Sequence, residues 1–499
     1  MARGQLLVSG ILALCTTLCH AADDIKTLRV PDGPGPAAPV VGGSFVSYSI
    51  EFANFHDFVG NASHPNDLTL RLVQNLANVA GSYPRIRIGG STANRATYVP
   101  DQEQAILLNF TTPGADQPTS LTWGPSWLRG FDVLPSKVKY TLGLPFNSGA
   151  AGEENTLASA KAAYGGLQDK LYAFQIGNEF DAIWAKQWLE RSEAVMDMLS
   201  SSFNRGRDPI FQTGVFVPPG SITSDTSWTP QAAIENGVTS QGTVNSFSIH
   251  QYFGAACYAT PTLASSILNH TWLETNMKFH EVTSNFMTLH GIKYIIGETN
   301  SIACQGLAGV SDVFGSALWA VDYALYAASL NVSSLHFHMG TGYRYSAWQP
   351  RLNGTTLPGP RPLYYGHLVA AEALAGGNKQ VKILASEPSF SAYGIYTNGD
   401  AQKLRHIVLV DLREHLSSAT ARPTTRIRKG QVITAKRLSA PGVDARTDIE
   451  WAGQRVSDEG NVEGEVVLET VKGGDVELAA GEVVMLSFTP RCKSGHTRS

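Results

Sequence analysis

The chain has 499 residues, of which 43% are hydrophobic and 16% are charged, so it can bury a large core and does not have the composition of a disordered chain. Its formal net charge is −4, which excludes nucleic-acid binding driven by overall charge and indicates no strong attraction to sulfated polyanions.

The first residues have the organisation of a secretory signal, which we assign to residues 1–22. Arg3 supplies the positive charge, residues 6–18 the apolar stretch, and residues 19–22 a cleavage region with small side chains. A membrane anchor is the alternative, but the apolar run is short for a span. We therefore expect a secreted protein with no membrane partner. Five glycosylation sequons agree with secretion, at Asn61, Asn109, Asn269, Asn331 and Asn353.

Residues 23–42 contain a short candidate strand at 25–30 and a connector rich in Pro and Gly. Eight apolar runs with the length of buried strands then follow. Asn66 is placed to cap the helix after the first of them. We expect an α/β fold, a (β/α)8 TIM barrel over residues 43–377, with strands at 45–55, 84–91, 138–146, 171–179, 210–217, 244–253, 292–298 and 334–339.

The pattern of apolar and polar residues changes after residue 377. Short apolar runs broken by Gly, Pro, Asn and Asp replace the alternation of strands and helices. This pattern predicts a C-terminal antiparallel β-sandwich domain over residues 378–490, which the strand at 25–30 is expected to join. Residues 491–499 form a polar tail.

Two predicted strands end in the same way, with Gly177, Asn178 and Glu179 at the end of the fourth strand and Gly297 and Glu298 at the end of the seventh. In such barrels the carboxyl ends of the strands carry the chemistry, so the two carboxylates are expected to face one basin. Glycoside hydrolysis needs this pair, with carboxyl groups about 5–5.5 Å apart in retaining enzymes and about 6.5–9.5 Å apart in inverting ones.

We assign Glu179 as the acid/base, Glu298 as the nucleophile and Asn178 as a ligand of the sugar 2-hydroxyl. The alternative is that each Glu ends a strand in an exposed loop. His250 and Tyr252 point the same way from the sixth strand, and the Tyr252 hydroxyl is placed to orient the nucleophile.

Further candidates lie at other strand ends. Glu51 and Arg87 are expected to bind sugar hydroxyls or to brace Glu298, with an ordinary ion pair as the alternative for Arg87. His336 and His338 are candidates for either the core or the site. The loop after the eighth strand contains Tyr343, Arg344 and Tyr345. We expect these three side chains to bind polar substituents of the sugar.

Without the signal, the chain keeps Cys257, Cys304 and Cys492. The first two follow neighbouring predicted barrel strands and lie on one rim, so we predict a disulfide between them. No spacing of His and Cys residues predicts a metal site, and the expected chemistry needs no cofactor.

At these residues the chain resembles glycoside hydrolase family 79, the β-glucuronidases and heparanases. The matching features are residues 177–179, 297–299 and 89–91, the pair His250 and Tyr252, and the terminal sandwich. The resemblance implies Glu179 as acid/base and Glu298 as nucleophile. It also implies sugar-binding roles for Glu51, Asn178 and Tyr252, and it assigns Tyr343 to the carboxylate of a glucuronate.

The leading hypothesis is therefore a secreted retaining β-glucuronidase that acts on polysaccharide or proteoglycan glycans. Two alternatives stay open. One is a retaining β-glycosidase for a neutral sugar, of the xylosidase or glucosidase type. The other is a carbohydrate-binding barrel without catalytic activity.

Overall fold

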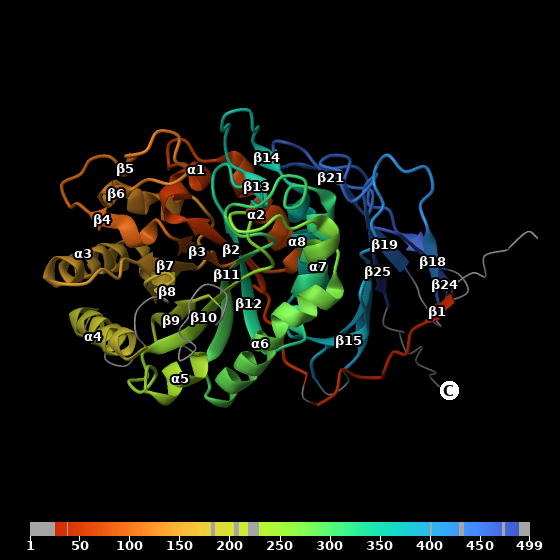
Figure 1. Ribbon diagram of the computed structural model, residues 1–499, viewed down its shortest axis with the longest axis horizontal. Helices are drawn as coiled ribbons and strands as arrows, with labels where there is room; N and C mark the ends of the chain where they lie inside the picture. The colour runs from red at the N-terminus through yellow and green to blue at the C-terminus, as the bar shows by residue number, and fades with distance from the viewer. Residues whose placement is uncertain are drawn as a thin grey trace, which may run out of the picture.

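The computed structural model describes residues 25–36, 38–180, 185–203, 209–217, 229–399, 402–428, 434–471 and 475–488. The predicted signal and polar tail lie outside the described residues. Figure 1 shows two parts side by side, a barrel with its helices and a sheet domain built from the C-terminal part of the chain.

Eight parallel strands close into a barrel and follow one another in chain order around it. The prediction of a TIM barrel is confirmed, and every predicted barrel strand is present. The strands are β2 (Val46–Glu51), β3 (Ile86–Gly89), β7 (Tyr140–Leu144), β8 (Leu171–Ile176), β9 (Phe211–Phe216), β10 (Val244–Tyr252), β11 (Lys293–Asn300) and β12 (Val332–Met339).

Helices surround the barrel, and the predicted cap is present, because Oδ1 of Asn66 accepts a hydrogen bond of 3.0 Å from the Thr69 amide. A π-helix, η5 (Leu263–Ile267), precedes α6. Within the described residues, no helix combines the length and apolarity that crossing a bilayer requires. The helices are α1 (Phe55–Val59), α2 (Asp67–Ala80), α3 (Ala150–Leu167), α4 (Ala185–Phe203), α5 (Pro230–Glu235), α6 (His270–Leu289), α7 (Phe314–Ala328) and α8 (Pro362–Ala373).

The crossover from β3 to β7 differs from the expected strand–helix unit. It holds a small sheet in the order β4-β6-β5 and no α-helix. Trp127 in this segment stacks on Phe52 with ring centroids 4.4 Å apart, so aromatic packing replaces the apolar face of a helix. The elements are η2 (Ala93–Arg95), β4 (Ala96–Tyr98), β5 (Ile106–Asn109), β6 (Ser120–Trp123) and η3 (Pro125–Asp132).

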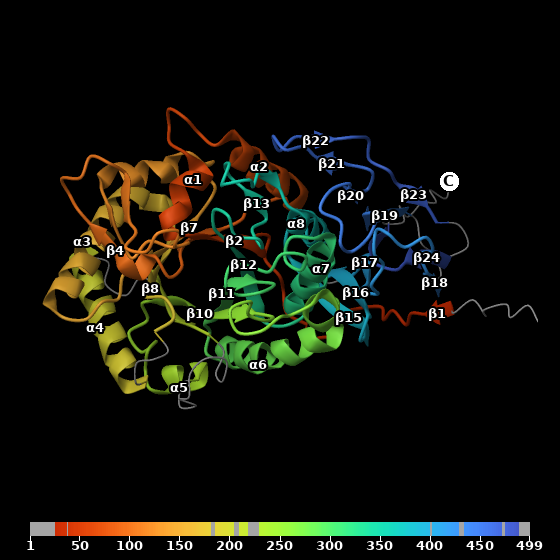
Figure 2. The same ribbon diagram turned by 45° about the horizontal axis from the view of Figure 1, so that its top comes forward.

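The C-terminal domain has two main sheets, as predicted, and an apolar cluster that includes Leu409, Ile427 and Leu478 lies between them. The predicted N-terminal strand joins this domain, because β1 pairs in parallel with β18, far from the barrel (Figure 2). One sheet contains β15 (Lys379–Glu387), β16 (Phe390–Thr397), β17 (Leu404–Asp411), β25 (Glu482–Ser487), β19 (Thr434–Ser439), β20 (Glu450–Trp451) and β23 (Glu469–Thr470), and the other β1 (Ile25–Thr27), β18 (Thr424–Arg428) and β24 (Asp475–Ala479).

Two short hairpins complete the described strands. They are β13 (Trp348–Gln349) with β14 (Gly359–Pro360), in the loop after β12, and β21 (Arg455–Val456) with β22 (Val462–Glu463), in the sheet domain. Helices α7 and α8 pack against each other and against strands of this domain. Every residue of α7 is buried, including Ser316 and Asp322.

Candidate active site

A shift of register between β10 and β11 places the candidate nucleophile beside the histidine of the neighbouring strand. Ile249 pairs with Ile296, but the next residue, His250, pairs with Glu298. Gly297 is skipped at this point, and a Cβ on it would lie 2.1 Å from Oγ of Ser248. A side chain here would have to displace the Ser248 hydroxyl, and the irregularity aims His250 and Glu298 at the same region of the barrel mouth.

The acid/base candidate sits on a sharp turn at the end of β8. Gly177 has φ of +75°, and a Cβ on it would lie 2.8 Å from the ring of Phe180. Glu179 itself has φ of 54°, which is uncommon for a residue other than glycine. Its amide donates a 2.9 Å hydrogen bond to the Val215 carbonyl of the adjacent strand. A residue that its neighbours hold in such an uncommon backbone conformation is frequent at functional sites.

The two glutamates meet at the barrel mouth. One carboxylate oxygen of Glu179 and one of Glu298 lie within 4.8 Å of each other. The Glu298 side chain is 8% exposed and that of Glu179 29% exposed, so one carboxylate is deep in the barrel and the other faces the entrance.

Both oxygens of Glu298 are held by donors. The Tyr252 hydroxyl donates to Oε1 at 2.9 Å, and Nη1 of Arg87 donates to Oε2 at 2.6 Å. Burial opposes the charged form of this carboxyl, but His338, His250 and Arg87 outweigh it and hold the pKa of Glu298 well below its usual range. The deep carboxylate is therefore ionised and oriented.

Arg87 connects two of the predicted residues, Glu298 and Asn178, to two further polar side chains. Besides Glu298, it donates to Oγ of Ser49 at 2.7 Å, to Oδ1 of Asn178 at 2.5 Å and to Oε1 of Gln175 at 2.6 Å. We did not predict Ser49 or Gln175 from the sequence. The available signal for Gln175 was a polar side chain inside the otherwise apolar strand β8, which is uncommon unless that side chain has a partner.

His250 lies between the glutamates. Its Nδ1 shares a 2.7 Å hydrogen bond with Oε1 of Glu179 and lies 3.9 Å from Oε2 of Glu298. One ligand atom from each of these three residues falls within a 4.8 Å group that has the composition of a cation site. The carboxylate of Glu298 already has Arg87 and Tyr252 as partners. The three residues are therefore equally well explained without a cation, as two glutamates that share a proton with His250 between them.

Glu51 lies on the opposite wall. It accepts a 2.9 Å hydrogen bond from the Thr92 amide and lies 3.1 Å from Nε2 of His338. Burial favours neutral His338, but Glu298 and Glu51 outweigh burial and raise its pKa. The second candidate histidine, His336, belongs to the core, where burial lowers its pKa and its nearest polar partner is Ser334.

The loop after β12 contributes two tyrosines to the mouth. Tyr343 and Tyr345 are each 3% exposed, with rings 6.1 and 6.2 Å from His338. The Tyr343 hydroxyl accepts a 3.1 Å hydrogen bond from Gln117, which lies between β5 and β6. The sequence did not point to Gln117, because the sheet that carries it was itself unexpected. Arg344, expected beside the tyrosines, is directed instead toward Gly306 outside the mouth.

A disulfide joins Cys257 and Cys304 on the rim formed by the segments after β10 and β11. Among the predicted glycosylation sites, Asn61, Asn109 and Asn353 are exposed, and Asn269 and Asn331 are partly buried. Glycosylation of these asparagines stays a prediction.

Known proteins are similar to this chain in sequence and in fold. Residues 392–485 match the model of the glycosyl hydrolase family 79 C-terminal beta domain. A beta-glucuronidase of Aspergillus niger is 31% identical over 462 residues, covering 84% of this chain and 84% of that protein. A beta-glucuronidase of Neurospora crassa is 29% identical over 494 residues, covering 85% and 86%.

Among solved structures, a 4-O-α-L-rhamnosyl-β-D-glucuronidase from Fusarium oxysporum 12S superposes with a TM-score of 0.77 at 24% identity, over 93% of this chain and 100% of that one. A family 51 α-L-arabinofuranosidase from Thermotoga petrophila gives a TM-score of 0.61 at 11% identity, over 94% and 100%. These two likenesses describe the fold.

Sequence and fold together define a glycoside hydrolase, built as a TIM barrel with a C-terminal sheet domain. Within that class the chain belongs to glycoside hydrolase family 79.

Proposed function

We propose that this chain is a secreted β-glucuronidase that cleaves terminal glucuronate with retention of configuration, using Glu298 as nucleophile and Glu179 as acid/base. The observation that carries the proposal is the pair of carboxylate oxygens within 4.8 Å of each other, because so short a separation agrees with the spacing of about 5–5.5 Å in retaining enzymes and not with the spacing of about 6.5–9.5 Å in inverting enzymes. The names of the two curated relatives support the choice of sugar.

In the first step, a Glu298 oxygen attacks the anomeric carbon while Glu179 gives its proton to the glycosidic oxygen. The leaving group departs as an alcohol, and the sugar is left as an ester on Glu298. Arg87 and Tyr252, which hold Glu298, keep it ionised and aimed before attack. This prior orientation is the source of much of the rate that such groups supply.

In the second step, Glu179 is a carboxylate and takes a proton from water, whose oxygen attacks the same carbon from the opposite face. The ester bond to Glu298 breaks, and glucuronate leaves with its original configuration. The partial exposure of Glu179 supports this role, since water must reach it after the leaving group departs. His250, at 2.7 Å, orients Glu179 in both steps.

The walls of the pocket support recognition of an acidic sugar. The Tyr343 hydroxyl accepts from Gln117, so its own proton is available to a carboxylate. Burial and the nearby Glu51 raise the pKa of Tyr343, which keeps that proton in place. Arg87 occupies the amide oxygen of Asn178, leaving the Asn178 nitrogen to donate to the sugar 2-hydroxyl.

The proposed substrates are polysaccharide or proteoglycan glycans outside the cell. The apolar stretch at residues 6–18 and the five sequons support secretion. Mass spectrometry of the protein from the medium of its own host would test this part. A chain beginning near residue 23 is expected, and an intact N-terminus inside the cell would contradict it.

Activity is tested with an aryl glucuronide and a natural glucuronoside. We expect Glu298→Gln to lower kcat on both substrates on the order of 10³-fold or more. We expect Glu179→Gln to cost about 10²–10⁴-fold on the natural glycoside and much less when the aryl leaving group needs no proton. Glu154→Gln, an exposed position on α3, is the matched control and should retain wild-type rates.

NMR of the first product formed would report its anomeric configuration. Release of the β anomer agrees with retention, and the α anomer would disprove the two-step route. A panel of aryl glycosides separates the sugars, because faster hydrolysis of a xyloside or glucoside than of the glucuronide would replace the proposed substrate with a neutral one.

A further inference from the structure

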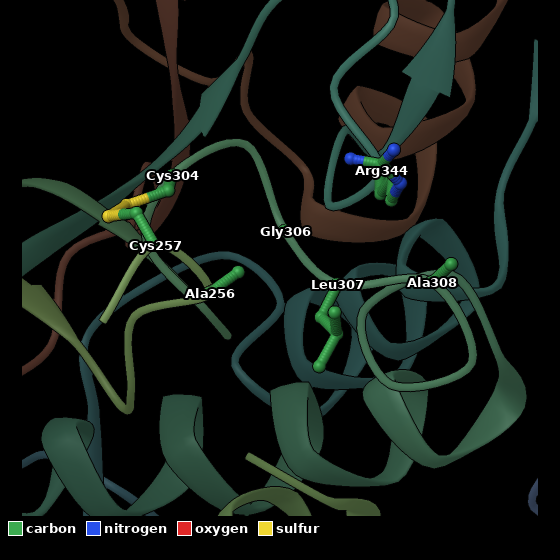
Figure 3. Close-up of a pocket in the computed structure, with 7 residues that line it drawn as sticks. All are labelled: Ala256, Cys257, Cys304, Gly306, Leu307, Ala308 and Arg344. Carbon is green, nitrogen blue, oxygen red and sulfur yellow. A yellow bond between two sulfur atoms is a disulfide. The ribbon is translucent and has the colours of Figure 1, made fainter. Parts of the chain in front are cut away.

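Two hollows on the catalytic rim lie beside the mouth of the barrel and share one residue, Arg344. The first, about 290 Å³, is lined by the disulfide Cys257–Cys304, Leu307 and Arg344. Figure 3 shows the disulfide on one side of it and the Arg344 guanidinium on the other. The second, about 530 Å³, is lined by Tyr343 and Arg344 and continues to the junction with the sheet domain.

The loop after β12 forms the wall between the catalytic mouth and these hollows. Tyr343 and Tyr345 turn their rings toward His338 in the mouth. Arg344, between them, has its Cβ packed toward Gly306, and its amide donates a 2.8 Å hydrogen bond to the Gln305 carbonyl. Tyr343 and Tyr345 therefore face the catalytic mouth, whereas Arg344, between them, faces the adjoining hollows.

The second hollow carries an excess of positive charge. Arg344, Arg361 and Arg446 line it together with a single carboxylate, Asp312. Asp312 is engaged by Arg446 at 3.1 Å, and Arg361 donates to the Leu357 carbonyl at 2.8 Å. The Arg344 guanidinium is exposed and has no hydrogen-bond or ion-pair partner among the described residues. One guanidinium is thus left to bind an anion.

We propose that the hollows around Arg344 form a second sugar subsite, which binds an acidic unit of the glycan next to the sugar that is cleaved. The ligand group is an oxyanion, either the carboxylate of a uronate or a sulfate ester. Both match the planar fork of a guanidinium. The inference rests on the proposed function and deepens it, since it makes acidic glycans the preferred substrates although the whole chain carries a net charge of −4.

The test compares wild type, Arg344→Gln and Arg344→Lys on four substrates. These are an aryl glucuronide without a neighbouring sugar, and glucuronate-terminated oligosaccharides in which the next unit is a uronate, a sulfated sugar or a neutral sugar. We expect Arg344→Gln to lower kcat/KM about tenfold on the acidic oligosaccharides through KM, and to leave the aryl glucuronide and the neutral oligosaccharide within twofold. Arg344→Lys keeps the charge but loses the planar fork, so it should recover part of the loss. Added salt should weaken binding of the acidic oligosaccharides more than that of the aryl glucuronide and the neutral oligosaccharide.

Arg129→Gln provides a control with the same change of charge, because Arg129 is exposed on η3 and lines neither hollow. The uronate and sulfate substrates identify which oxyanion is bound. Equal loss on all four substrates would mean a structural role for Arg344, and no loss on any would mean no subsite. Either result overturns the proposal.

A failure of the proposed function is seen separately, as a wild-type enzyme that does not cleave the aryl glucuronide. In that event, calorimetric titration of wild type and Arg344→Gln with the same uncleaved acidic oligosaccharides decides the matter. Binding weakened about tenfold in the variant supports the subsite, and equal binding rejects it.

Discussion

At the scale of single residues, Glu298 and Glu179 are the same side chain in two environments. Glu298 is deep in the barrel, with a cation and a hydroxyl on its two oxygens, whereas Glu179 is partly exposed and touches one histidine. Fixed positive charge favours the ionised form of the first. This difference in environment supports the proposed roles, because the nucleophile of a retaining enzyme must be ionised.

Replacing Arg87 tests this assignment through pH. A carboxylate attacks only above its own pKa, and Arg87 is one of the groups that lower the pKa of Glu298. Arg87→Gln removes that charge, so the pKa rises and the acid limb of kcat/KM moves to higher pH. The measurement is the pH profile of kcat/KM for an aryl glucuronide. Arg87→Lys, which keeps the charge, should shift the limb less than Gln does.

The matched control is Arg85→Gln, two residues earlier on the same chain segment, where the guanidinium lies 4.6 Å over the ring of Tyr172 and away from the carboxylates. Its acid limb should stay in place. An unmoved limb in Arg87→Gln, with activity merely lower at every pH, would show that Arg87 acts on the position of Glu298 and not on its charge.

Residues at strand ends were predictable because a parallel barrel brings all carboxyl ends to one rim. That argument placed Glu179 and Glu298 at the barrel mouth, where their carboxylates meet. Ser49 and Gln175 were missed, because their importance comes from a shared partner, Arg87, and pairing across strands is not visible in local sequence. Arg344 was expected to read the sugar because it stands between Tyr343 and Tyr345, but the loop turns at this point and Arg344 lines the hollows outside the mouth.

At the scale of elements, the eight strands were predictable from length and apolarity, whereas the crossover between β3 and β7 was not. Its strands β4, β5 and β6 are three or four residues long, too short to give a periodic signal.

Backbone pairing also extends β10 and β11 past the barrel, because the Ala303 amide donates a 2.8 Å hydrogen bond to the Gly254 carbonyl. The disulfide fastens the two extensions a few residues further on.

Removing that disulfide tests its contribution to stability. The two cysteines are 47 residues apart in sequence, and a loop of this size corresponds to a loss of up to about 4 kcal/mol in the free energy of unfolding when the link is absent. We expect the double variant Cys257→Ser with Cys304→Ser to unfold at lower urea concentration than wild type. Wild type measured in reductant should match the variant, and the variant should not respond to reductant. Equal midpoints would show that backbone pairing alone holds the rim.

At the scale of the whole molecule, the barrel and the sheet domain share buried polar contacts, and the sequence could predict each domain but not what joins them. Asp322 on α7 is 1% exposed. It accepts hydrogen bonds from Ser391 at 2.6 Å and from Tyr393 at 2.5 Å, both on β16, and lies 2.8 Å from Nδ1 of His270 on α6. One carboxylate thus connects two barrel helices to the C-terminal domain.

Asp322→Asn should therefore destabilise the folded chain by about 3 kcal/mol, the cost of breaking a buried charged pair, with a definite dependence on pH. Burial lowers the pKa of His270, but Asp322 outweighs it and the pKa in the folded protein is raised. The stabilisation by this pair is fully present below the pKa of an unfolded histidine, about 6.5, and is lost as the pH rises through the folded value. Urea unfolding should show a larger loss in the free energy of unfolding for Asp322→Asn at pH 5.5 than at pH 9.

Tyr393→Phe removes one hydrogen bond and no charge, so its loss of about 1 kcal/mol should be the same at both pH values. A deficit for Asp322→Asn that is equally independent of pH would mean that His270 stays neutral and that Asp322 joins the domains by hydrogen bonding alone.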